Sequence, residues 1–229
     1  MLDTPFDIPA VDYGNQWDYK KLYYSDHMAA LRVPVTLQKG YDLVRAGTTL
    51  ARNISAGGGL NLLVPYNPTI FPVSIDIGRA YLITDSGALA TTLYVTLEDS
   101  YKFMVGDDII INDNSTAAEN LGAITAIDRT TDSFRAAITV TTAVGATSFT
   151  TARRAHISVE AGNSSNNYSD CVGILEKTVN TGTGEKSKGA VSTLILGNCV
   201  LYEGLLTNLD AAAIVDLGAS TFGQYVYIR

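Results

Sequence analysis

The sequence contains few of the residues from which enzyme and metal sites are usually built. It has two cysteines and two histidines in 229 residues. His27 and His156 lie far apart, and neither has a cysteine or a carboxylate at a spacing typical of metal ligands. A G-x-S-x-G motif, an H-E-x-x-H pair and a phosphate-binding loop are also absent. We therefore expect a protein that is not an enzyme and that uses no metal or cofactor.

The two cysteines are too few for a disulfide framework. Cys171 and Cys199 both lie in apolar, strand-like runs, which favours buried free thiols. A disulfide between them is the alternative.

Basic residues and long apolar segments are scarce as well. The chain has 16 basic and 23 acidic residues, which gives a formal net charge of −7. Nucleic acid is bound through clustered lysine and arginine, so we expect no nucleic-acid partner. There is no run of eighteen apolar residues, and the first residues lack the basic start and apolar core of a signal peptide. The sequence predicts no membrane partner and synthesis in a cytoplasm.

Short runs rich in valine, isoleucine and threonine dominate the rest of the chain. Residues 33–38 and 43–52 are the first of them, and glycines separate them. Between residues 79 and 162 such runs recur every eight to twelve residues, which is typical of a small barrel or sandwich. Residues 115–121 are predicted to form a short helix or turn. The fold class is therefore expected to be mainly β.

One oxygen-rich stretch, residues 107–114, is a candidate calcium loop. It contains Asp107, Asp108 and Asp113 but lacks the central glycine and the final glutamate of an EF-hand loop. We interpret it as a turn between strands.

A linker and a helix are the clearest features of the C-terminal third. Residues 162–167 are all small and polar, which predicts a boundary between folded units. Thr207 is a candidate N-cap with Asp210 three residues later, and a helix is expected over residues 209–217. Its apolar side should pack on a sheet, and an alternating last strand is expected at residues 225–228.

The N-terminal residues show neither a strand pattern nor a helix pattern. Residues 12–24 are aromatic and polar, with no sustained period of 2 or 3.6. Exposed rings in a terminal segment suggest anchors for a partner, so residues 1–32 are predicted to form an extended arm. A strap folded onto its own domain is the alternative. The candidate contact residues are Tyr13, Trp17, Tyr19, Tyr23 and Tyr24.

Two stretches resemble the head decoration, or cement, proteins of phages related to lambda. The run 170–175 (DCVGIL), followed by 196–203 (LGNCVLYE), the alanine-rich helix and the last strand, has the order of that family's C-terminal part. Residues 40–50 (GYDLVRAGTTL) look like its upstream strand. The matching pieces cover less than half of the chain, and their order is more specific than any single motif. The chain departs from the family by about eighty additional residues, 79–162.

The resemblance implies a lambda-decoration-like β domain with one short helix. Residues 33–78 and 163–229 would form this domain, interrupted by a small inserted β barrel or sandwich at residues 79–162. It also implies a homotrimer that binds the major capsid protein on the outer surface of a tailed-phage virion and stabilises the expanded head. The alternative function is a tail or head-fibre module that binds a glycan or receptor on the host surface.

Overall fold

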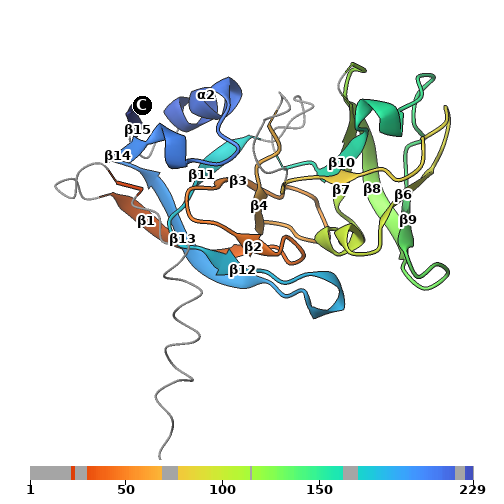
Figure 1. Ribbon diagram of the computed structural model, residues 1–229, viewed down its shortest axis with the longest axis horizontal. Helices are drawn as coiled ribbons and strands as arrows, with labels where there is room; N and C mark the ends of the chain where they lie inside the picture. Colours follow the sequence, from red (N-terminus) through yellow and green to blue (C-terminus); the bar gives the residue numbers. More distant parts are fainter. Residues whose placement is uncertain are drawn as a thin grey trace, which may run out of the picture.

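The computed structural model describes residues 22–23, 30–68, 77–113, 115–161, 170–219 and 225–228. The fold is mainly β, as the sequence predicted, and two β units lie side by side (Figure 1). Within the described residues, no helix is both long enough and apolar enough to cross a membrane.

The first unit is a closed barrel of five strands. Its strand order is β1 (Leu31–Leu37), β13 (Ala190–Gly197), β11 (Cys171–Leu175), β3 (Thr49–Arg52) and β4 (Leu63–Pro65). Two small sheets flank it: β2 (Leu43–Val44) pairs with β12 (Val179–Asn180), and β14 (Cys199–Tyr202) pairs in parallel with β15 (Tyr225–Ile228). Helix α2 (Ala211–Ala219) contacts β11, and the short helices η3 (Gly184–Lys186) and η4 (Glu203–Leu205) lie in loops.

The second unit is a curled sheet of six strands. Its order is β5 (Ala80–Tyr81), β10 (His156–Val159), β7 (Asp108–Asn112), β8 (Glu119–Asp128), β9 (Arg135–Val140) and β6 (Thr92–Thr96). A bridge between Leu82 and Val95 joins the two edges, so the sheet curls toward a barrel. The short helices η1 (Asp99–Lys102) and η2 (Thr151–Arg153) lie between strands.

Each unit has its own apolar core, built by alternation along the strands. In β6 and β9, Leu93 and Val95 alternate with half-exposed residues, and Leu93 pairs with Ile138. The core of the curled sheet draws on residues 80–159. The barrel core instead combines residues 22–66 with residues 161–217. Residues that precede and residues that follow the second unit in the sequence thus build the barrel core together. The predicted domain boundaries, 33–78 with 163–229 and 79–162, stay a prediction. The predicted linker at residues 162–167 lies outside the described residues.

The start of the helix differs from the sequence prediction. Asp210 caps α2, because its Oδ1 accepts the N–H of Ala213 at 2.8 Å. Thr207 was predicted to be the cap, but its N–H donates to the carbonyl of Gly47 and it forms a bridge with Thr48. Pairing with the barrel has taken the place of capping. Ala213 and Leu217 are buried, as predicted.

A second difference concerns residues 115–121. Ser115 and Thr116 form a bend in which their N–H groups donate to Asp113, so part of the stretch is the predicted turn. Glu119 already begins β8, and its partner Ile111 in β7 sets the start of that strand.

The beginning of the barrel also includes residues assigned to the arm. Leu22 is 2% exposed and belongs to the barrel core, and Leu31 and Arg32 begin β1. β1 pairs with β13 along its full length from Leu31. The prediction that the arm extends to residue 32 was therefore wrong at its C-terminal end.

Both cysteines are free and buried, as predicted. Burial raises the pKa of both thiols, that of Cys199 to about 11. Neither is a reactive thiolate at neutral pH.

Candidate functional site

The predicted contact residues of the arm fall mostly outside the described part of the chain. This is the case for Tyr13, Trp17, Tyr19 and Tyr24, and for His27. Of the five candidates, Tyr23 alone is described.

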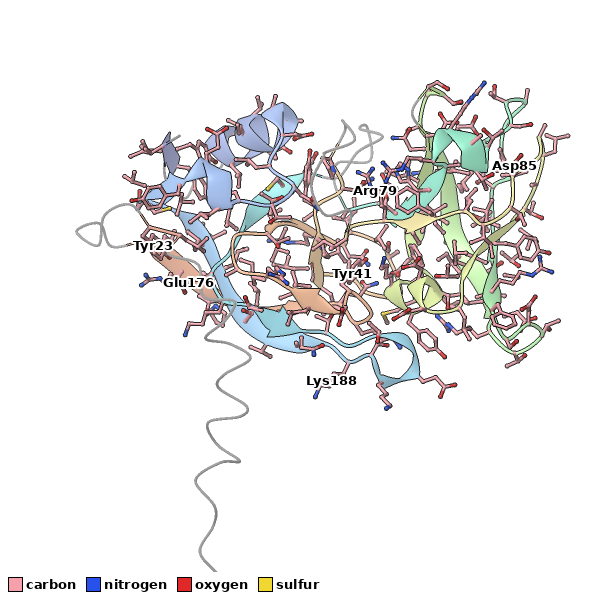
Figure 2. All side chains as sticks on the ribbon, viewed as in Figure 1. Tyr23, Tyr41, Arg79, Asp85, Glu176 and Lys188 are labelled. Carbon is pink, nitrogen blue, oxygen red and sulfur yellow. The ribbon has the colours of Figure 1, made fainter. Side chains whose placement is uncertain are left out.

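Tyr23 is fixed to the barrel by a polar cluster. Its hydroxyl donates to Glu176 Oε1 at 2.9 Å, and the Arg32 guanidinium lies 5.3 Å from the centre of its ring. Arg32 Nε lies 2.6 Å from the same Glu176 oxygen. Burial raises the pKa of Tyr23 to about 12, against the opposing effect of its hydrogen bond with Arg32. Figure 2 shows Tyr23 and Glu176 close together beside β1. The chain just before the barrel therefore has a firm anchor.

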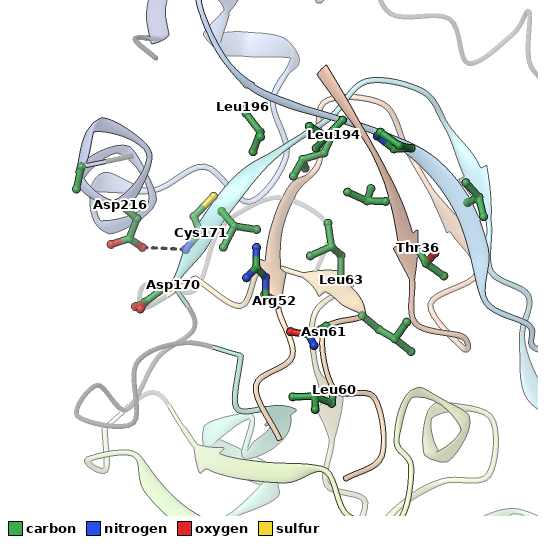
Figure 3. A pocket seen from close by; sticks show the side chains of 17 residues that line it. Thr36, Arg52, Leu60, Asn61, Leu63, Asp170, Cys171, Leu194, Leu196 and Asp216 are labelled. Atoms are coloured by element: carbon green, nitrogen blue, oxygen red, sulfur yellow. Dashed lines mark hydrogen bonds between the residues drawn. The ribbon is translucent and has the colours of Figure 1, made fainter. Parts of the chain in front are cut away.

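A groove of about 950 Å³ runs along β1 and is here called the β1 groove (Figure 3). Four consecutive residues of β1, Val33 to Thr36, line it. Side chains of a strand alternate between two faces, so four residues in a row line one hollow only along the edge of the strand. The cause is an open seam: β1 pairs with β13 over seven residues but with β4 only at Leu37 and Leu63.

The walls of the β1 groove are aliphatic, and its rim is charged. Arg52 lies inside it, and Asp170 and Asp216 lie on the side of α2 (Figure 3). Asp216 Oδ2 accepts the N–H of Cys171 at 2.9 Å, while burial raises the pKa of this carboxyl. Such a mixture of aliphatic walls and a few polar groups is typical of binding sites. The remaining walls are formed by Leu60, Asn61, Leu62, Leu63, Val172, Val191, Leu194, Leu196 and Ala219.

The sequence did not predict this groove, because its walls are ordinary apolar strand residues of the kind expected in a core. Pro34 was the available signal, because a proline within a strand is confined to edges and bulges.

A buried polar junction joins the two β units. At its centre the carboxylate of Asp107, 0% exposed, accepts four hydrogen bonds. Two come from the barrel side chains of Gln38, at 3.1 Å, and Asn53, at 2.9 Å. Two come from the backbone N–H groups of Gly59, at 3.0 Å, and Met104, at 2.8 Å. The turn predicted at this point is present, but its aspartate also binds a unit that is distant in the sequence.

Further polar side chains are buried beside this junction, on the outer face of β7 and β10. Asn67 donates to Ser158 at 2.8 Å, and Asn120 donates to Glu160 Oε2 at 2.7 Å. Glu160 is 4% exposed, and its Oε1 has no hydrogen-bond partner among the described residues. Burial raises the pKa of Glu160 and the charge of Asp108 raises it further, while Asn120 opposes the shift.

This raised pKa predicts a pH dependence of stability. The folded protein binds the Glu160 proton more tightly than the unfolded chain, so the free energy of unfolding falls as pH rises above the ordinary value of 4.5. We expect Glu160→Gln to fall less steeply between that pH and neutrality, because the amide does not titrate. Urea unfolding over a pH series measures both slopes. Glu185→Gln, at an exposed position, should keep the wild-type slope. Parallel curves for Glu160→Gln and the wild type would contradict the assignment.

Among the described residues, no three histidine, cysteine, aspartate or glutamate side chains converge as metal ligands. His156 is 1% exposed, and its ring packs edge-on against Tyr81 with 5.8 Å between ring centres. The shape and lining of the β1 groove make it the candidate binding site.

Comparison of this chain with protein-family models, with curated proteins and with solved structures finds no match.

Proposed function

We propose that this protein is a decoration, or cement, subunit that binds the outer surface of a tailed-phage capsid and stabilises the expanded head. Its contact would be with the major capsid protein, made through the aromatic residues before the barrel, and its assembly would be a homotrimer. The resemblance of residues 40–50 and 170–203 to lambda-type decoration proteins supports this proposal.

The observation that carries the proposal is the anchorage of Leu22 and Tyr23. Leu22 is buried in the barrel core, and Tyr23 forms a bridge with Leu201 and bonds Glu176. Tyr13, Trp17 and Tyr19 directly precede this fixed point in the sequence. Only a few residues would therefore separate a partner that binds these rings from the folded barrel. Each well-buried aromatic anchor contributes about 2 kcal/mol or more to such a contact.

The anchorage also defines the deletion that tests the proposal. Removing residues 1–20 spares Leu22 and Tyr23, so the barrel should keep its stability. We expect this variant to lose binding to purified expanded capsids, measured by co-sedimentation, because the aromatic anchors are gone. Trp17→Ala should weaken binding by about 30-fold if it removes about 2 kcal/mol. Unchanged binding of the deletion variant would contradict the proposed contact.

One observation favours the alternative, a module that binds a glycan or receptor on the host. Phe134 is 85% exposed on the turn between β8 and β9, where its N–H donates to Asp132 and its carbonyl accepts the N–H of Leu97. The ring is thus presented by an ordered turn, as expected for a contact residue. Phe134→Ala is the matched variant in the capsid assay. It should bind capsids like the wild type, and a loss of cell binding instead of capsid binding would favour the alternative.

A further inference from the structure

The open edge of β1 provides a place for an additional strand. Gln38 N donates to the carbonyl of Leu63 at 2.8 Å, which fixes the side of β1 that faces β4. Backbone groups of alternate residues point to the same side of a strand, so those of Pro34 and Thr36 also face this side. Pro34 has no N–H, which suits a residue whose backbone groups face away from β13. On the N-terminal side of Leu37, β4 does not pair with β1, and the groove lies there instead.

The lining of the groove specifies an apolar, extended occupant. Val33, Val35 and Val172 line the hollow. Leu60, Leu63 and Leu194 line it as well (Figure 3). Leu60 is 49% exposed, so the groove leaves apolar surface in contact with solvent. A strand that adds to an edge gains affinity from main-chain hydrogen bonds and specificity from alternate side chains in apolar pockets.

The N-terminal sequence supplies a segment with these properties. In residues 2–10, the even positions are Leu2, Thr4, Phe6, Ile8 and Ala10, and the odd positions are Asp3, Pro5, Asp7 and Pro9. Thr4 is the one polar residue of the even set, and Val11 ends the alternation. An extended chain would place the first set on one face and the second on the other. Both prolines occupy odd positions, so their missing N–H groups fall on a single edge of such a strand. The opposite edge keeps every donor and can pair with β1.

The described chain before the barrel has a defined direction at Leu22 and Tyr23. The N–H of Tyr202 donates to the carbonyl of Leu22 at 3.1 Å, and Tyr23 bridges Leu201 in antiparallel orientation. Traced toward the N-terminus, the chain therefore heads along β14 toward Glu203. Leu22 also packs beside Gly47, whose N–H donates to Leu175 at the end of β11. Cys171, at the other end of β11, lines the groove, so Leu22 lies beside the end of β11 that is opposite to Cys171.

We propose that residues 2–11 of one copy dock as an added strand in the β1 groove of a second copy. The groove and the segment are different surfaces, so the contact is heterologous, and repeated head to tail it forms a ring where the rotation between copies closes. The barrel seam of each copy is then completed by its neighbour. This inference rests on the groove and on the pattern of residues 2–11, and it does not depend on binding to a capsid.

The test captures the occupant of the groove and identifies the copy from which it comes. Leu60→p-benzoylphenylalanine places a photo-crosslinker on the groove wall at a half-exposed position. This variant is made with ¹⁵N and mixed with the unlabelled full-length protein, and the crosslinked peptides are identified by mass spectrometry. We expect the labelled groove peptide joined to unlabelled peptides that contain residues 2–11. The same crosslinker at Leu89, which is 75% exposed on the other unit, should capture none of them.

Two other outcomes would overturn the proposal. Capture of labelled residues 2–11 alone would mean that each segment occupies the groove of its own copy. Capture of no peptide from residues 2–11 would mean that the groove has another occupant or none. A second measurement avoids the crosslinker: Phe6→Asp with Ile8→Asp should shift the sedimenting species toward the monomer, because both changes place carboxylates against aliphatic walls. Asp3→Asn, on the opposite face, should sediment like the wild type, and identical sedimentation of all three proteins would also contradict the docking.

Discussion

Asp107→Ala is expected to lower the free energy of unfolding by about 3–5 kcal/mol, the scale on which a buried charged group is lost from its partners. The variant leaves the amides of Gln38 and Asn53 and the N–H groups of Gly59 and Met104 without their acceptor. All four lie at a site where Asp107 itself is fully buried, so water does not readily replace the carboxylate. Urea unfolding followed by circular dichroism measures the change.

Two variants make the result specific to the junction. Asp85→Ala also removes a hydrogen-bonded aspartate, one that accepts from Thr151 at an exposed position, and should change stability little. Figure 2 places Asp85 on the curled sheet, away from the junction. Asp107→Asn keeps one acceptor oxygen but turns an N–H₂ group toward donors, so its loss should be intermediate. A loss for Asp107→Ala no larger than that of Asp85→Ala would contradict the role given to the carboxylate.

Gly40→Ala is expected to cost about 2–4 kcal/mol, because strain of the backbone and overpacking add at the same position. Gly40 has a φ of +92°, which disfavours a side chain. A Cβ there would overlap the carbonyl of Tyr101 and lie 2.6 Å from Lys102 N, both backbone atoms of the other unit. Relief would require the two units to move apart, since neither atom can rotate away. Thermal unfolding measures the loss.

Gly87→Ala is the matched control for this substitution. A Cβ at Gly87 meets no atom within 4 Å, so the variant should unfold close to the wild type. Equal stability of the two alanine variants would show that the close approach of the barrel and the curled sheet at Tyr101 contributes nothing to the fold.

The junction has a consequence for the proposed function. Polar contacts with defined geometry hold the curled sheet on the barrel, including Gln38 with Lys102 O at 2.8 Å and Asp108 N with Ser55 at 2.7 Å. Directional bonds fix orientation as well as contact. If the barrel sits on a capsid, as we propose, the curled sheet would project from the shell in one direction and would present Phe134 to the surroundings.

Local patterns in the sequence determined the kind of fold. Alternation predicted the strands around Leu93 and Ile138, because a half-buried strand needs period 2. The alanine-rich run predicted α2 to within two residues at each end, including its buried residues Ala213 and Leu217. The apolar surroundings of Cys171 and Cys199 predicted buried free thiols. Each of these properties depends on residues that are neighbours in the sequence.

Only the tertiary structure decided what those elements do together. The sequence predicted Asp107 to be a turn residue, because its partners Asn53 and Gln38 lie 54 and 69 residues away. It predicted Tyr23 to be part of an arm, because Glu176 lies 153 residues away. Thr207 was predicted to be a cap for the same reason, since its partner Gly47 belongs to the other half of the barrel. The β1 groove arises where β4 stops following β1, which no local pattern encodes. The period of apolar residues shows which face of a strand or helix is buried. The partner of each residue depends on pairing between segments that are distant in the sequence.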